Sequence, residues 1–444
     1  MKASESGNAH AYRASILHFT GDPAFQQHAH EWFEDGLLIV ADGRVQAVGE
    51  YAKLKSHVSA DMVLHDYSGK LIVPGFIDTH VHYPQTDMIA SPASGLLPWL
   101  ETYTFPTEHQ FSNPDHARDV ASYFLDELLR CGTTTAMVYC TVHPGSVDAF
   151  FEASEARNLR MVAGKVLMDR HCPEYLQDSA EGGVRDSETL IKKWHKRGRQ
   201  LYAITPRFAA TSTDEQMRLA GELAQHHPDV FLQTHVAENT DEVAWVKSLY
   251  PKARSYLDVY EQFGMLRPRS TYAHCIWLDD EDRARLRATK SAIAICPTSN
   301  LFLGSGLFDF AKADAAHVLL SLATDVGGGT SFSMLQTMNE TYKVARMGGT
   351  HVSALRLFYL ATLGGARSMQ LEGLIGNFAY QAEADFIVLD PQATPLLARR
   401  VARTNSLEEM LFAFALLGDD RAVAATFAAG KLVHARTAHH GDRA

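Results

Sequence analysis

The sequence predicts an α/β fold: a (β/α)8 TIM-like barrel with a small β-sandwich domain built from both chain ends. Its 444 residues exceed the roughly 200 to 250 that such a barrel uses, so chain is left for an accessory domain. Eight short apolar runs alternate with helix-like stretches, the pattern of a parallel sheet. Further strand-like runs lie near both termini. We expect residues 71–374 to form the barrel and residues 1–70 and 375–444 to form the small domain.

The eight apolar runs have the composition of strands, and eight is the strand number of a TIM-like barrel. The run "KLIVPGFIDTHVH" and the run "TTTAMVY" are rich in the β-branched and aromatic residues that strands favour. The expected strands cover residues 70–82, 133–139, 160–168, 201–208, 230–236, 270–275, 291–297 and 318–325.

Helix signals fill the intervals between these runs. Residues 116–132 and 213–228 carry apolar side chains at helical spacing, with a glycine ending the first stretch and a threonine opening the second. Outside the barrel, "GLLIVADGRVQAVG", "ADFIVLD" and "AATFAAGKLVHA" have the composition of short strands with turn glycines. We expect these strands from both ends of the chain to meet in one small β-domain.

Composition restricts the classes of partner. Lys and Arg total 41 against 52 Asp and Glu, a net charge of −11, which disfavours nucleic acid as a partner. No stretch approaches the roughly 18 apolar residues of a membrane span, and residues 1–23 lack the apolar segment of a secretory signal. The five scattered cysteines form no Cys-x-x-Cys pair. We expect a cytoplasmic protein that acts on a small molecule, without nucleic-acid or membrane partners.

His80 and His82 stand one residue apart at the end of the first apolar run. Alternate residues of a strand point to the same side, so both imidazoles face one point, as two ligands of one metal ion would. The chain has 22 histidines, so a hydrogen-bonded pair at a strand edge is the ordinary alternative. The pair by itself does not decide between the two interpretations.

Ligand-type residues end three further runs: His235, His274 and Asp325. Active sites of TIM-like barrels lie at the carboxyl ends of the strands, so these residues are expected to meet the first two histidines. A buried imidazole or carboxylate is costly unless it is hydrogen-bonded or coordinated. Imidazoles with one carboxylate suit zinc or, second, Fe(II), and leave a position for a water nucleophile. The sequence therefore predicts a metal centre.

Glu238 follows His235 by three residues, in the loop after the fifth run. A carboxylate at that position could reach the same centre and carry protons. A solvated loop glutamate is the ordinary alternative.

These residues resemble the signature of the amidohydrolase superfamily, in which a Pro-Gly strand ends in His-x-His and further strands end in His, His and Asp. The resemblance covers nearly the whole chain. Within the superfamily, six stretches resemble those of the guanine deaminase family in the same order: "VPGFIDTHVHYPQ", "WLETYTFPTE", "ITPRFAATS", "THVAEN", "CPTSNLFLGSGLF" and "LGDDR". The resemblance implies hydrolytic deamination of guanine to xanthine and ammonia.

The resemblance also implies one zinc ion per chain, bound by His80, His82, His235 and Asp325. Binuclear members of the superfamily bridge two metals with a lysine after strand four, but "LYAITPRFAATS" contains no lysine. Lys165 in strand three is more often a satisfied barrel-end residue than a ligand. A single metal is therefore expected.

The implied catalytic residues are Glu238, Asp325 and His274. Asp325 takes a proton from the attacking water, and Glu238 gives one to the ring nitrogen next to the reacting carbon. His274 is implied to lie beside the water and the departing amino group.

Guanine is flat and rich in hydrogen-bonding edges, so its pocket requires fixed donors and an apolar face. The resemblance assigns Gln85 and Arg207 to the polar edge, Phe208 to the face and Trp99 to the wall. The two aromatic residues could instead belong to the core. The complete implied substrate-binding set is Gln85, Trp99, Arg207, Phe208, His235, Glu238 and Asp325.

Two other functions stay open at this stage. The same metal apparatus serves deaminases or chlorohydrolases of pterins, triazines and other aminopurines, because the metal does not select the ring. A non-catalytic barrel that binds other proteins is the alternative from a different class, although it would not require the proton-carrying residues. The resemblance to the guanine deaminase family implies a homodimer.

Overall fold

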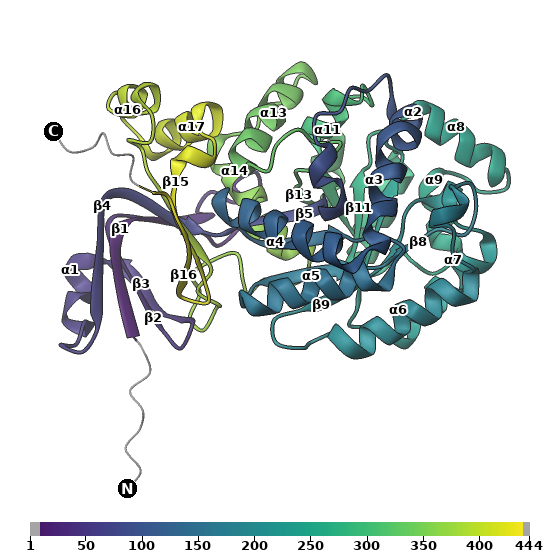
Figure 1. Ribbon diagram of the computed structural model, residues 1–444. Helices are drawn as coiled ribbons and strands as arrows, with labels where there is room; N and C mark the ends of the chain where they lie inside the picture. The colour runs from purple at the N-terminus through teal and green to yellow at the C-terminus, as the bar shows by residue number, and fades with distance from the viewer. Residues whose placement is uncertain (1–8, 438–444) are drawn as a thin grey trace, which may run out of the picture.

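The computed structural model describes residues 9–437, so residues 1–8 and 438–444 of the expected small domain lie outside the described part of the chain. The molecule consists of a parallel barrel surrounded by helices and a seven-stranded mixed sheet beside it (Figure 1). The barrel strands follow the order of the sequence, and each neighbouring pair is parallel. They are β5 Phe76–His82, β6 Thr133–Tyr139, β7 Arg160–Gly164, β9 Leu201–Pro206, β10 Phe231–Val236, β11 Ser270–His274, β12 Ala292–Ile295 and β13 Leu319–Leu322, with β8 Val166–Leu167 paired to β9.

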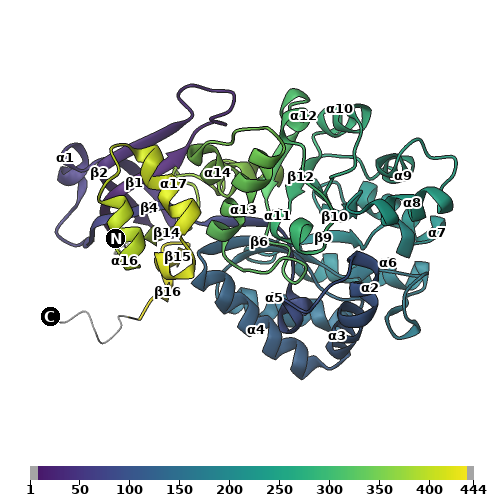
Figure 2. The ribbon, with the colours of Figure 1, turned by 90° about the horizontal axis from the view of Figure 1, so that it is seen from above.

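Helices follow the strands and cover the outside of the barrel (Figures 1 and 2). The two helices expected from spacing are present as α4 and α7, and Asn113 and Thr213 cap their first turns. The outer helices are α4 Pro114–Arg130, α5 Pro144–Ala156, α6 Ala180–Trp194, α7 Asp214–His226, α8 Thr240–Leu249, α9 Tyr256–Gln262, α10 Asp280–Thr289, α11 Pro297–Phe302, α12 Phe310–Ala315, α13 Met334–Met347, α14 Ala354–Leu360 and α15 Leu363–Ser368.

The first expected strand, residues 70–82, is not one strand. Its first part belongs to β4, Val63–Pro74, in the seven-stranded sheet, and its second part is β5 in the barrel. Gly75 separates them, because a Cβ at this position would lie 2.1 Å from the Thr134 hydroxyl oxygen of the neighbouring strand. The chain therefore changes from one sheet to the other where only glycine fits.

Side chains join the first and last barrel strands, β5 and β13, where the backbone ladder between neighbouring strands stops. Asp78 is fully buried and accepts hydrogen bonds from the Thr324 hydroxyl and from the Thr324 N–H at 3.1 Å. The Asp325 N–H donates to the His80 carbonyl at 3.0 Å. These bonds hold the ends of two strands that are remote in sequence at a fixed separation.

The seven-stranded sheet has the order β16-β15-β14-β4-β1-β2-β3 and combines strands from both chain ends. The purple amino-terminal and yellow carboxyl-terminal strands lie side by side in both views (Figures 1 and 2). The strand β1 was not expected from the sequence. The bounds are β1 Ala9–Phe19, β2 His30–Ala41, β3 Arg44–Glu50, β4 Val63–Pro74, β14 Phe386–Leu389, β15 Val423–Ala428 and β16 Lys431–Ala435.

This sheet closes on itself like a sandwich. The Tyr12 ring of β1 packs edge-on against Phe427 of β15 at 5.2 Å between centroids, although two strands separate β1 from β15 in the sheet. At the turn after β15, a Cβ on Gly430 would lie 2.8 Å from Val40 of β2. The two halves of the sheet therefore enclose a separate apolar core, and the expectation of a small β-sandwich domain from both chain ends is confirmed.

Further helices belong to the connections of the sheet: α1 Tyr51–Leu54 follows β3, and α16 Pro395–Val401 and α17 Leu407–Leu417 lie between β14 and β15. After β5 the chain forms a 3₁₀ turn, Tyr83–Met88, then α2 Leu96–Trp99, a π-helical turn Leu100–Thr104 and α3 Phe105–His109. None of the helices within residues 9–437 is long and apolar enough to cross a membrane.

Candidate metal centre and active site

Four predicted ligands meet at the carboxyl ends of the barrel strands. The Nε2 atom of His82 lies 3.3 Å from that of His80 and 3.2 Å from that of His235. Asp325, three residues beyond β13, places Oδ1 at 3.2 Å from His80 Nε2 and 3.4 Å from His82 Nε2. One potential ligand atom from each residue lies within 4.8 Å of all the others.

Hydrogen bonds and backbone conformation orient these ligands. The Nδ1–H of His235 donates to the Arg207 carbonyl at 2.7 Å, which leaves its Nε2 lone pair for the centre. Asp325 and His274 have left-handed backbone, with φ of 51° and 71°, a conformation that costs a non-glycine residue about 1–3 kcal/mol. Strain of this kind is typical of residues that must point at a functional centre.

The protonation states suit a cation. Burial lowers the pKa of all three imidazoles, that of His82 to about 3, so they are neutral and can coordinate a metal. Burial alone would raise the pKa of Asp325, but His80 and the neighbouring histidines hold it well below its usual value. Three neutral imidazoles and one carboxylate form a donor set that fits a divalent cation such as zinc.

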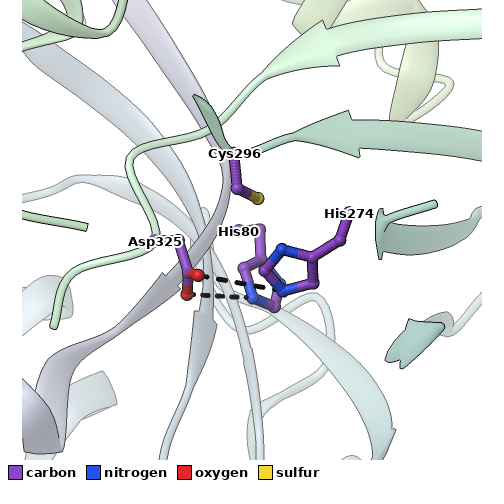
Figure 3. A group of neighbouring side chains, drawn as sticks. All are labelled: His80, His274, Cys296 and Asp325. Atoms are coloured by element: carbon purple, nitrogen blue, oxygen red, sulfur yellow. Dashed lines mark ion pairs between the residues drawn. The ribbon is translucent and has the colours of Figure 1, made fainter. Parts of the chain in front are cut away.

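A second group of four overlaps with this one: His80, His274, Cys296 and Asp325 (Figure 3). Cys296 follows β12, and its side chain is the uppermost of the four in Figure 3. Burial raises the pKa of its thiol well above the usual value, whereas a metal ligand must be a thiolate. The set with three imidazoles therefore fits a metal better.

His274 lies beside the four ligands. Its Nδ1–H donates to Asn300 Oδ1 at 2.9 Å, so Nε2 faces the centre. That nitrogen is 3.3 Å from Glu238 Oε2 and 3.8 Å from Asp325 Oδ2. Its position connects the two carboxylates that were expected to carry protons.

Glu238 is buried, not a solvated loop residue. Burial, with a contribution from Asp325, raises the pKa of Glu238 to about 8, so the carboxyl group holds a proton at neutral pH. The Ser305 hydroxyl donates to its Oε1 at 3.2 Å. A second buried glutamate, Glu242, accepts the backbone N–H of Glu238 at 2.9 Å and that of Asn239 at 3.2 Å. These contacts hold the loop in place.

A pocket opens onto the centre. Nine of the ten predicted site residues line this pocket. The tenth, His80, contacts one of them, since its Nε2 lies 3.3 Å from that of His82. The structure therefore brings the whole predicted set together. The lining consists of His82, Gln85, Leu96, Trp99, Leu100, Arg207, Phe208, His235, Glu238, Glu242, His274, Leu303, Asp325 and Gly328.

The aromatic residues of the set have a double role. Phe208 is 5% exposed and packs against Trp245 at 5.9 Å between ring centroids, so it belongs to the core as well as to the pocket. Trp99 is buried, and its Nε1–H has no hydrogen-bond partner among residues 9–437. The core and pocket interpretations of these two residues are therefore compatible.

Arg207 has a protein partner that the sequence did not reveal. Its Nη1 donates to Glu108 Oε1 at 2.9 Å and Oε2 at 2.8 Å, and both side chains are almost completely buried. Gln85 Nε2 donates to the same Oε1 at 3.0 Å. The expectation that a substrate carbonyl is the natural partner of this arginine is therefore incomplete, because Glu108 already balances its charge.

Sequence reasoning missed the residues that support the site, although signals for them existed. Glu108 ends the stretch "WLETYTFPTE", and Asn300 and Ser305 lie in "CPTSNLFLGSGLF". Glu242 stands three residues after Asn239, the spacing of a capping box, and the structure contains that capping box at the start of α8. Lys165 is buried and ion-paired with Asp178 at 2.5 Å, as expected of a structural lysine.

The fold and this site define an α/β-barrel hydrolase with a candidate metal centre at the carboxyl ends of its strands. The model of the amidohydrolase family matches residues 71–433. The chain therefore belongs to the amidohydrolase family. Guanine deaminase from Escherichia coli (strain K12) is 50% identical over 96% of this chain and 98% of its own length.

Solved structures agree with this assignment. The structure of E. coli guanine deaminase superposes with a TM-score of 0.94 and covers 96% of this chain and 100% of its own. Guanine deaminase from Bradyrhizobium japonicum, 34% identical, has a TM-score of 0.94 and covers 97% of this chain and 100% of its own. Atrazine chlorohydrolase from Arthrobacter aurescens, complexed with zinc, is 20% identical with a TM-score of 0.83 over 96% and 95% of the two chains, and this shows the shared fold alone.

Proposed function

We propose that this chain catalyses the hydrolytic deamination of guanine to xanthine and ammonia. The observation that carries the proposal is the 50% identity to a guanine deaminase along almost the full length of both chains. The site adds chemical support, since a buried donor set for a divalent cation and two proton-carrying carboxyl groups face one pocket. Ultraviolet monitoring of guanine loss, with measurement of released ammonia, tests the proposal.

In the proposed reaction, water adds to the ring carbon that bears the amino group, and the bond from carbon to the amino nitrogen then breaks. A divalent metal held by the four ligands supplies a Lewis acid that activates the water. Asp325 accepts the proton that the water gives up and later passes it to the amino nitrogen, which leaves as ammonia. Glu238, which holds a proton at neutral pH, delivers this proton to the adjacent ring nitrogen. It regains a proton from the hydroxyl group on the ring carbon when the carbonyl group of xanthine forms. His274 lies between the two carboxyl groups and faces the departing ammonia.

We expect purified protein to contain about one zinc per chain, because His80, His82, His235 and Asp325 form a single compact ligand set. Elemental analysis after removal of loosely bound ions measures the metal content per chain. Iron in place of zinc would change the identity of the metal and leave the ligand assignment unchanged. Two tightly bound metals per chain would contradict the mononuclear assignment.

Arg207 is proposed to donate hydrogen bonds to the carbonyl oxygen of guanine. Arg207→Ala would leave the buried Glu108 carboxylate without its positively charged partner. Such a change typically lowers the free energy of unfolding by about 3–5 kcal/mol. Arg207→Lys is the sharper test, since it keeps a positive charge near Glu108 and removes the guanidinium donors. We expect catalytic efficiency on guanine to fall at least about tenfold.

The matched measurement for Arg207→Lys uses 2,6-diaminopurine, which has an amino group in place of that carbonyl. The wild type should strongly prefer guanine, and the variant should discriminate less. An unchanged preference for guanine would show that Arg207 stabilises the fold and that another residue recognises this edge of the purine.

Two alternative functions have less support. A triazine or pterin hydrolase would share the metal apparatus, but the chlorohydrolase is only 20% identical to this chain. A non-catalytic scaffold would have no requirement for the buried Glu238 beside the centre. Rapid turnover of a pterin or triazine without turnover of guanine would favour the first alternative.

We also propose that the enzyme acts in the cytoplasm as a homodimer. All five cysteines are free in the structure, which suits a reducing compartment. The dimer rests on the resemblance to the guanine deaminase family, and light scattering coupled to size-exclusion chromatography tests it.

A further inference from the structure

A buried carboxylate, Glu108, contacts two polar side chains that line the pocket, Gln85 and Arg207. Glu108, on α3, is 1% exposed and is not one of the predicted site residues. Its Oε1 accepts from Gln85 Nε2 at 3.0 Å and from Arg207 Nη1 at 2.9 Å, and its Oε2 accepts from the same Nη1 at 2.8 Å. One carboxylate therefore fixes two side chains that line the pocket.

The Gln85 amide is held from both ends. Its Oε1 accepts the backbone N–H of Gly327 at 3.2 Å, while its Nε2 donates to Glu108. A carboxylate only accepts and a backbone N–H only donates, so this pair of partners admits one orientation of the amide. The Oε1 acceptor of Gln85 is therefore occupied by the Gly327 N–H. The second N–H of its Nε2 is the group that can still donate to a ligand.

Arg207 is restricted in the same sense. Both of its side-chain bonds to Glu108 come from Nη1. Neither Nε nor Nη2 forms a hydrogen bond with another residue in the described part of the chain. A guanidinium has donors and no acceptor. Gln85 and Arg207 therefore present an edge of donors only. Glu108 sets the orientation of the Gln85 amide and holds the Arg207 guanidinium in position.

We propose that Glu108 is a positioning residue that determines substrate class: it fixes the Gln85 amide as a donor and holds the Arg207 guanidinium in place. The resulting edge selects rings with a carbonyl oxygen at that edge over rings with an amino group. This rests on the proposed function and deepens it. A 6-oxopurine presents acceptors to both donors. A 6-aminopurine would place its amino N–H groups against the N–H groups of Gln85 and Arg207. These buried donors would then lack acceptors.

The test compares Glu108→Gln with the wild type on guanine and on 2,6-diaminopurine. Glutamine has the same shape, but its amide also donates, so it no longer forces one orientation on Gln85 or balances Arg207. We expect catalytic efficiency on guanine to fall about tenfold, mainly through KM, and the preference for guanine over 2,6-diaminopurine to fall at least about tenfold. Glu101→Gln is the matched control, an exposed carboxylate on the same segment, and should change neither value.

Binding measurements separate this inference from the proposed function. Hypoxanthine and adenine differ at the same edge and lack the reacting amino group, so their Kd values report the edge without turnover. The wild type should favour hypoxanthine, and Glu108→Gln should reduce that preference. If Glu108→Gln does not fold, Glu108→Asp serves, since a shorter carboxylate cannot reach both partners. An unchanged hypoxanthine preference in a folded variant overturns the role of Glu108, whereas absence of guanine turnover in the wild type overturns the proposed function alone.

Discussion

Glu238→Gln is expected to reduce guanine turnover by about 10²- to 10⁴-fold while metal content stays the same. Glutamine keeps the shape of Glu238 and its bond from the Ser305 hydroxyl at 3.2 Å, but it cannot transfer a proton. Burial raises the pKa of the native carboxyl group to about 8, so the wild type holds the proton that the ring nitrogen requires. Because Glu238 lies outside the four-ligand set, its replacement should leave the metal in place.

The control for this variant is Asp241→Asn. Asp241 is an exposed carboxylate in the first turn of α8, three residues further along the chain. The Asp241→Asn variant should retain nearly full activity. Steady-state kinetics with elemental analysis of the same preparations measures both quantities, and near-normal turnover of Glu238→Gln would remove this residue from the proposed proton transfer.

Asp325→Asn should have an effect of about 10³-fold or more on catalytic efficiency, together with weaker metal binding. The substitution removes the one anionic donor among three neutral imidazoles and the proposed acceptor of the water proton. The backbone bond from residue 325 to the His80 carbonyl does not involve the side chain and should persist, so the fold should be retained.

The two roles of Asp325 can be separated by adding zinc. Excess zinc should restore metal content in Asp325→Asn without restoring turnover, because asparagine does not accept the proton. Asp87→Asn, an exposed carboxylate in the turn after β5, is the matched control. Full recovery of turnover by zinc would show that Asp325 acts as a ligand and not as the proton acceptor.

The sequence predicted the barrel because its strands are uniformly apolar and regularly spaced. The second expected strand, residues 133–139, has the same bounds in the structure, and all its residues are buried. The family and the fold class are confirmed by the comparisons. The roles of the individual site residues stay predictions, although the structure brings them to one pocket.

The strand boundary at Gly75 shows where local pattern was insufficient. Residues 70–82 are one apolar run in the sequence, and nothing in their composition marks two sheets. The division depends on the close approach of Thr134, a residue of the next barrel strand. Contacts of this kind exist only after the strands have paired.

The sequence by itself determined the types of residue that end the strands and the shared face of His80 and His82, which follows from the two-residue period of a strand. Only the tertiary structure decided how the pocket is supported. Glu108 and Arg207 are 99 residues apart, and their hydrogen bonds depend on where α3 packs against the barrel. Periodicity reports which side of its own element a residue faces, whereas the partner on that side is set by the packing of distant elements.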